Sequence, residues 1–266
     1  MNQIVGLKRL DGSVCASPEE DKAEVQEFYQ HLYTSQGFHN MDRLLQFVPE
    51  RVTPEMNADL QRPFDATDVR TALFQMAPSK APGIDGFTAG FFQRHWSILE
   101  KDLVPAVLDF LNGGELPTGL NDTSITLIPK VRHPQSITQY RPISLYPVPY
   151  KIAAKAITNR LKPWMDSIVG EEQSAFVPGR LITDNVLVAF ESIHSMKRRK
   201  KGKNFSCAIK LDMMKAYDRL EWDYLRGTMT KLGFDGHWID IVMRMISSVS
   251  FSVCFNGERL ESFNPT

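Results

Sequence analysis

One carboxylate in the chain stands where a strand pattern changes to a helix pattern. Residues 205–212, with the sequence FSCAIKLD, alternate along their length, so Ile209 and Leu211 share one face and Asp212 lies on the other. From Ala216 onward the apolar residues recur at helical spacing. Rigid backbone at such a junction can fix an oxygen ligand for a divalent metal. The alternative is that Asp212 caps the following helix, and spacing alone leaves both interpretations open.

Basic side chains are unevenly distributed, although Lys+Arg and Asp+Glu both total 31. Residues 1–62 carry ten acidic and six basic side chains, whereas residues 123–165 carry seven basic ones and no acidic one. Residues 197–203 place six basic side chains in seven positions. This segregation is typical of a face that binds a polyanion. The predicted nucleic-acid-binding residues are Lys151, Lys155, Lys162, Lys197, Arg198, Arg199, Lys200, Lys201 and Lys203. For the run 197–203 the alternative is a solvated loop.

Composition narrows the class of protein. The chain of 266 residues is 42% hydrophobic and 23% charged, which is ordinary for one or two globular domains. Its three cysteines are too far apart to indicate a disulfide framework or a cysteine zinc site. The sequence contains no apolar run of about 20 residues and no signal-peptide core, so we expect an intracellular, non-membrane protein.

The elements that must position Asp212 can be read from periodicity and turn residues. Helices are predicted near residues 18–33, 66–77, 88–96, 103–112, 150–164 and 238–249, and a further helix follows the loop 173–180 and runs into the basic cluster 197–203. A β-branched run at 123–128 predicts a strand, and Asn256-Gly257 predicts a hairpin. Because a terminal two-stranded hairpin is marginally stable by itself, we expect the fold to continue beyond Thr266.

Several ordered blocks together resemble the reverse transcriptase of plant LINE-type, non-LTR retrotransposons. The blocks are APSKAPGIDGFTAGFFQRHW (77–96), ITLIPK (125–130), YRPISL (140–145), YKIAAKAITNRL (150–161), QSAFVPGR (173–180) and KLDMMKAYDRLEW (210–222). The resemblance covers roughly three-quarters of the chain. Residues 1–62 resemble the segment that joins an upstream endonuclease to the polymerase in such elements.

The resemblance implies an α+β, right-hand polymerase fold in truncated form. The expected divisions are an N-terminal helical or linker segment (1–62), the fingers (63–200) and an incomplete palm (201–266). The implied reaction is RNA-templated DNA synthesis, for which the family uses two Mg²⁺ ions. The implied partners are an RNA template, a DNA primer and deoxynucleotides, and the family implies a nuclear location.

The resemblance also assigns roles to individual residues. Asp212 matches the first metal-binding and catalytic aspartate, and the backbone carbonyl of Met213 would be a further metal ligand. Tyr217 matches the aromatic residue that rejects ribonucleotides by its bulk. Arg141 resembles the finger arginine that contacts the incoming triphosphate, and Lys130 is a second candidate for that contact. We interpret Asp218 as a residue at the start of the following helix.

The 266 residues lack two motifs that are typical of the family. Neither a Gln-Gly-Asp-Pro block nor an Ala-Asp-Asp block occurs in the 266 residues. We therefore expect this chain to be an N-terminal fragment without polymerase activity of its own. A non-catalytic nucleic-acid-binding remnant is the alternative function. A purely helical interaction module would explain the apolar stripes but not the ordered blocks.

Overall fold

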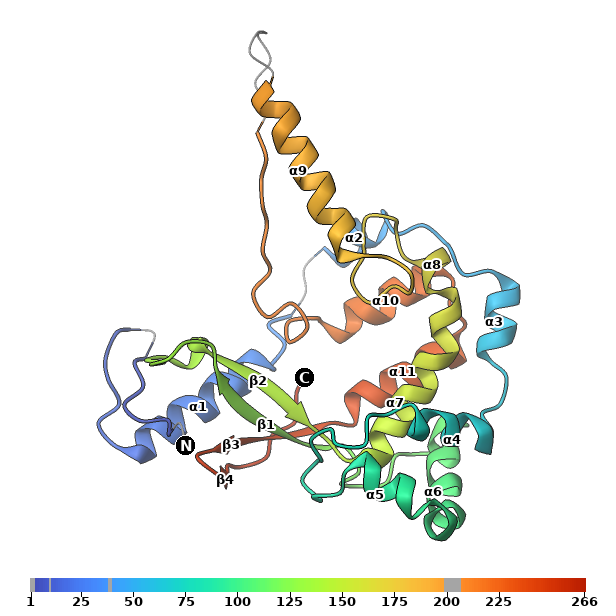
Figure 1. Cartoon of the computed structure of the whole chain (residues 1–266), viewed down its shortest axis with the longest axis horizontal. Coiled ribbons are helices and arrows are strands. Elements are labelled where there is room, and N and C mark those ends of the chain that lie inside the picture. The colour runs from blue at the N-terminus through green and yellow to red at the C-terminus, as the bar shows by residue number, and fades with distance from the viewer. Residues whose placement is uncertain (1–2, 10, 38–39, 199–206) are drawn as a thin grey trace.

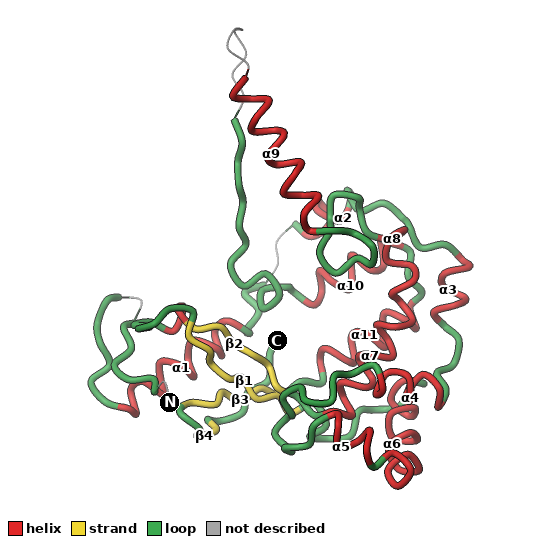
Figure 2. Tube along the Cα trace, in the orientation of Figure 1, coloured by secondary structure: helices red, strands yellow, loops and turns green. Residues whose placement is uncertain are grey.

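The computed structural model describes residues 3–9, 11–37, 40–198 and 207–266. These residues form a small sheet with helix α1 (Pro18–Leu32) beside it, a group of packed helices, and helix α9 (Ile182–Arg198), which projects away from the rest (Figure 1). Figure 2 shows the same separation of strands from helices. No helix in this described part is long and apolar enough to cross a membrane.

The predicted helices are present, and the structure adds short helices within 41–60 and at 165–168, where none was predicted. The further helices are α2 (Met41–Leu45), α3 (Pro54–Leu60), α4 (Ala66–Phe74), α5 (Ala89–Arg94), α6 (Trp96–Leu111), α7 (Val148–Leu161), α8 (Met165–Ile168), α10 (Trp222–Leu232) and α11 (Gly236–Ser247). Short 3₁₀ turns occur at Ile137–Gln139 and Lys162–Trp164. The strands are β1 (Asp122–Pro129), β2 (Tyr140–Leu145), β3 (Ser250–Phe255) and β4 (Glu258–Arg259).

The sheet joins two distant parts of the chain. Its strand order is β2-β1-β3-β4, with β1 antiparallel to β2 and parallel to β3. Ile125 on β1 therefore lies opposite Val253 on β3. The predicted hairpin is confirmed, because β3 and β4 pair around Asn256 and Gly257, whose φ angles of 50° and 91° suit a two-residue turn. The predicted strand at 123–128 is confirmed by β1.

Helix α1 packs against this sheet. Its start is fixed by Ser17, whose hydroxyl accepts a hydrogen bond from the Glu20 backbone N–H. The buried carboxylate of Asp21 accepts hydrogen bonds from the backbone N–H groups of Gly6 and Leu7 at 2.8 and 2.7 Å. The buried residues shared by the N-terminal segment and the sheet are Ile4, Leu7, Cys15, Val25, Tyr29, Ile125, Leu127, Ile137, Tyr140, Val253 and Phe255. The aromatic stripe of α1 is thus part of a core.

A second, larger core lies among the helices. Helices α4, α6, α7 and α11 supply most of its fully buried residues, which include Val69, Leu73, Val107, Phe110, Leu111, Ile152, Ala153, Trp238 and Ile241. The inward faces predicted for α6 and α7 are confirmed, since Leu103, Val107, Phe110, Ile152 and Ile157 are all buried. Burial of these apolar faces is the main stabilising contribution to this part of the fold.

The strand predicted over residues 205–212 is not formed. Phe205 and Ser206 lie outside the described residues, and residues 207–213 have no regular secondary structure. This segment descends beside α9 in Figure 1, away from the four strands. A strand is stabilised by hydrogen bonds to a neighbouring strand, and in the described structure no strand pairs with this segment.

Candidate functional site

Asp212 lies in an exposed, extended segment that leads into a turn at residues 214–219. Its neighbours Leu211 and Met213 are 88% and 72% exposed. The next helix, α10, begins only at Trp222, with Glu221 at its N-cap position. The interpretation of Asp212 as a helix cap is therefore wrong. The interpretation of Asp218 as a helix-start residue is wrong for the same reason.

The turn after Asp212 is held against helix α1 by Lys215. The Lys215 ammonium nitrogen lies 4.2 Å from the centroid of the Phe28 ring and 4.9 Å from that of Tyr29. It is buried and has no hydrogen-bond partner. Burial lowers the pKa of Lys215 to about 8, while the negative charge of Asp218 opposes that shift. Lys215 also has a φ of 55°, in the left-handed region.

Asp218 makes the second contact between the turn and α1. Its carboxylate accepts a hydrogen bond of 3.1 Å from the hydroxyl of Tyr33, just past the end of α1. Burial raises the pKa of Tyr33, and the negative charge of Asp218 raises it further. The Tyr33 ring stacks on Phe251 of β3 at 4.6 Å between centroids. A third contact joins Ser35 to Glu221, whose carboxylate accepts a 2.7 Å hydrogen bond.

The two predicted triphosphate-binding residues lie near each other on the sheet. Arg141 on β2 is opposite Ile128 on β1, two residues before Lys130. Both side chains are exposed, and the Lys130 ammonium donates a 2.9 Å hydrogen bond to the Thr138 carbonyl. The charge of Lys130 contributes to lowering the pKa of Lys215, which places Lys130 within electrostatic range of the turn.

Tyr217 lies on the outer side of the same turn. Its side chain is 76% exposed and meets the Phe176 ring edge-on at 6.1 Å between centroids. Lys215 and Asp218 point toward α1, whereas Tyr217 and Met213 are exposed to solvent. The turn therefore has one face anchored to α1 and one face open.

The predicted nucleic-acid-binding residues fall into separate settings. Lys197 and Arg198 are exposed at the far end of α9, and Lys162 is exposed after α7. Lys155 is half-buried. Lys151 donates a 2.9 Å hydrogen bond to the Ala81 carbonyl, and burial lowers its pKa. The remaining predicted residues, Arg199, Lys200, Lys201 and Lys203, lie outside the described residues.

Two other arginines in the recognised blocks have structural contacts. Arg160 is only 7% exposed, forms an ion pair with Asp68 at 2.8 Å, and stacks over the Phe64 ring. Arg180 pairs with Asp166 at 2.9 Å and donates further hydrogen bonds to backbone carbonyls of residues 166–173. Neither guanidinium is free to bind a polyanion, so Arg160 does not belong to the basic face expected over 123–165.

The donor chemistry at Asp212 suits one side of a magnesium site. Mg²⁺ takes oxygen ligands and is commonly held by one or two carboxylates together with water and substrate phosphates. Asp212 supplies an exposed carboxylate, and the Met213 carbonyl is the adjacent backbone oxygen. Across the described residues there is no group of three or more His, Cys, Asp or Glu side chains that could hold a metal ion. The described residues thus provide a partial ligand set.

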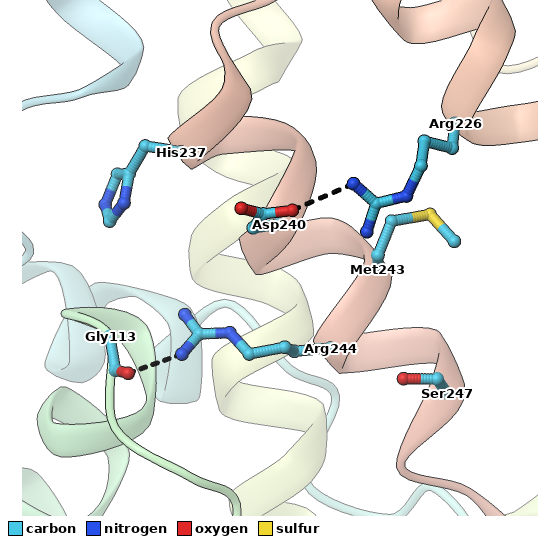
Figure 3. A pocket seen from close by; sticks show the side chains of 7 residues that line it. All are labelled: Gly113, Arg226, His237, Asp240, Met243, Arg244 and Ser247. Carbon is cyan, nitrogen blue, oxygen red and sulfur yellow. Dashed lines mark hydrogen bonds and ion pairs between the residues drawn. The ribbon is translucent and has the colours of Figure 1, made fainter.

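A pocket of about 360 Å³ lies elsewhere, where α11, α10 and the end of α6 meet (Figure 3). Arg226 forms a 2.9 Å ion pair with Asp240, and Arg244 donates hydrogen bonds to the carbonyls of Gly113 and Gly114. None of the predicted site residues lines this pocket. Since Arg226 is paired with Asp240 and Arg244 bonds backbone carbonyls, we assign this pocket no ligand.

The Asp212 segment lies within a region that is similar to a known protein family. The family model for reverse transcriptase (RNA-dependent DNA polymerase) matches residues 128–264, just over half of the chain. The match includes Lys130, Arg141 and the whole of the Asp212 turn. The chain belongs to the reverse transcriptase family, and its mixed α/β structure with a small sheet and many helices is consistent with a truncated polymerase fold.

Two retrotransposon proteins are similar to the chain. The uncharacterized 149 kDa protein of transposon TX1 from Xenopus laevis is 32% identical over 256 residues, which cover 96% of this chain and 19% of that protein. The Pol polyprotein of the type-1 retrotransposable element R2 from Popillia japonica is 25% identical over 174 residues, which cover 65% of this chain and 23% of that protein. The chain thus spans about a fifth of the length of these relatives.

The contacts of Lys215, Asp218 and Tyr33 were not predicted from the sequence. Phe28, Tyr29 and Tyr33 were recognised as an apolar stripe, but their partner lies about 185 residues away along the chain. A lysine and an aspartate three residues apart in a turn give no local signal that they face a distant helix. A tyrosine in an apolar stripe usually finds a hydrogen-bond partner for its hydroxyl; Tyr33 does so with Asp218, whereas the buried hydroxyl of Tyr29 has no partner among the described residues.

Proposed function

We propose that the chain contributes to RNA-templated DNA synthesis, with Asp212 as the first metal-binding and catalytic aspartate. The observation that carries this proposal is the reverse transcriptase match over residues 128–264, which contains Asp212 in an exposed segment with an open face beside it. Mg²⁺, when bound there, would supply electrostatic stabilisation of the attacking and leaving oxygens. Asp212 and the Met213 carbonyl are the ligands that this chain would provide.

The other residues of the site act on the nucleotide in this proposal. Arg141 and Lys130 attract the triphosphate, Arg141 through a fork of donors that can bond two phosphate oxygens. Arg141 on β2 pairs with Ile128 of β1, and Lys130 directly follows the end of β1, which supports a shared role. Tyr217 rejects the 2′-hydroxyl of ribonucleotides by its bulk, and its exposure on the open face of the turn supports contact with a substrate.

The finer parts of the assignment are proposals as well. We propose the division into an N-terminal segment (1–62), fingers (63–200) and palm (201–266), an affinity with plant LINE-type elements, and a nuclear location. Template RNA, DNA primer and deoxynucleotides are the proposed partners. A phylogeny of reverse transcriptase domains that placed this chain among animal elements would contradict the plant affinity.

Primer extension tests the catalytic proposal for the 266 residues by themselves. We expect no extension of a DNA primer on an RNA template, because these residues carry Asp212 but no Ala-Asp-Asp block. Wild-type chain and Asp212→Asn would be compared with Mg²⁺ and with Mn²⁺. Extension that depends on Asp212 would contradict the expectation of an inactive chain.

Nucleic-acid binding without catalysis is the second candidate function. The exposed positions of Lys162, Lys197 and Arg198 favour it. Phosphate contacts release counterions, so the affinity for an RNA–DNA duplex should fall steeply with salt. Lys197→Gln combined with Arg198→Gln should reduce the slope of log affinity against log salt by about 2, since each phosphate contact contributes about 0.9. The control is Lys101→Gln, which removes the same charge from an exposed lysine in α6 that is not among the predicted binding residues. A slope unchanged by the double substitution would count against this surface.

A further inference from the structure

Lys215, three residues after Asp212, has several energetically unfavourable features. Its φ of 55° is unfavourable for a residue with a Cβ. Its ammonium is buried between two aromatic rings without a hydrogen-bond partner. A buried, unpaired charge ordinarily destabilises a fold. Departures of this kind cluster where the backbone must be held in one place for function.

The surrounding contacts show what holds this backbone in place. Cation–π attraction to Phe28 and Tyr29 stabilises the ammonium where no hydrogen bond does. Three residues later, Asp218 is fixed by the hydroxyl of Tyr33. Tyr33 in turn stacks on Phe251, so the restraint extends into the sheet. Both ends of the turn are therefore tied to one rigid helix.

We propose that helix α1 positions the Asp212 carboxylate through Lys215 and Asp218, which makes these two residues positioning residues of the polymerase site. The inference rests on the proposed role of Asp212. It gives the N-terminal helix a part in the site, although α1 lies about 180 residues before Asp212 in the sequence. The open face of the turn, with Tyr217 and Met213, stays free for nucleotide and metal.

Backbone ¹⁵N relaxation of residues 211–219 in the 266-residue chain tests the restraint, because it reports motion at an amide whether or not that amide is hydrogen-bonded. Lys215→Gln removes the charge held by Phe28 and Tyr29, and Tyr33→Phe removes the donor to Asp218. Each should lower the order parameters of residues 211–219 to below about 0.6, the range of flexible backbone. Order parameters in α6 and α7 should not change. Lys215→Arg and Asp218→Asn should preserve the wild-type order parameters, because a cation and an acceptor remain.

The matched control is Lys210→Gln, which removes the same charge from an exposed lysine in the same segment. Order parameters in Lys215→Gln and Tyr33→Phe equal to those of the wild type would overturn the proposal. An equal loss of order in Lys210→Gln would also overturn it. This readout needs no metal, so it stands whether or not Asp212 is a ligand.

Binding of Mn²⁺ to the same variants separates positioning from simple electrostatics. Loss of a nearby positive charge should by itself strengthen cation binding at Asp212. Misplacement of the carboxylate should weaken it, and we expect Lys215→Gln to weaken Mn²⁺-induced broadening of the Asp212 amide about fivefold while Lys210→Gln does not. Unchanged or tighter binding in Lys215→Gln would overturn positioning. Absence of any broadening in the wild type would instead contradict the proposed role of Asp212.

Discussion

The helical core and the α9–Asp212 region use apolar residues in opposite ways. In the core, α4, α6, α7 and α11 bury one apolar face each, although Phe74 and Ile98 on these helices stay exposed. Helix α9 has 17 residues and none of them is buried. The side chains of Ile209 and Leu211, close to Asp212, are also exposed to solvent. Exposed apolar surface of this extent marks either an interaction site or an aggregation liability.

This difference separates the region that stabilises the fold from the region that carries the proposed chemistry. Packing in the helical core stabilises the fold without involving any proposed catalytic residue. The Asp212 segment receives its order from a few contacts with α1 at Lys215 and Asp218. Matched substitutions in the two regions should therefore have very different consequences.

The largest difference in the free energy of unfolding is expected between substitutions of two phenylalanines. Phe110→Ala, in α6, should reduce the free energy of unfolding by about 3–5 kcal/mol, because the side chain is only 1% exposed and its loss leaves a cavity. Phe190→Ala, in α9, should change it by less than about 0.5 kcal/mol, because the ring is 61% exposed. Urea unfolding of both variants measures this contrast. A cost for Phe190→Ala that approached that of Phe110→Ala would show that α9 is packed.

Substitutions of two arginines should differ by a somewhat smaller amount in the free energy of unfolding. Arg160→Met removes a buried guanidinium that pairs with Asp68 and bonds backbone carbonyls of residues 60–63, and should cost about 3 kcal/mol. Arg141→Met changes an exposed side chain and should leave stability within about 0.5 kcal/mol. Thermal or urea unfolding would decide the matter, and equal losses would refute the structural role given to Arg160.

The smallest expected effect is a difference in thiol reactivity between two cysteines. Burial raises the pKa of the Cys15 thiol beside the sheet, which lowers its thiolate fraction, whereas Cys207 next to the Asp212 segment is exposed. Cys207 should react with a maleimide on the order of a hundredfold faster than Cys15 under native conditions. Peptide mapping after timed labelling gives both rates in one sample. Comparable rates at the two positions would contradict the packing of the N-terminal segment on the sheet.

The features of the fold that local sequence patterns determine were predicted correctly. Periodicity predicted the buried faces of α6 and α7, and Asn256-Gly257 predicted the hairpin, because helix faces and tight turns are decided by neighbouring residues. The prediction of a strand over 205–212 was wrong, because alternation indicates only a preference, whereas a strand also needs a neighbouring strand to pair with. The parallel pairing of β1 with β3 and the Lys215–α1 contact are long-range, and no spacing rule identifies such partners.

The central functional claim is that Asp212 is a metal ligand in an exposed segment held by α1. Titration of the isotope-labelled chain with Mn²⁺, followed by amide NMR in the wild type and in Asp212→Asn, tests it most directly. We predict saturable broadening centred on Asp212 and Met213 in the wild type and its loss in Asp212→Asn, with resonances of α6 and α7 unaffected in both. Broadening that persists in Asp212→Asn, or that is absent from the wild type, would contradict the claim.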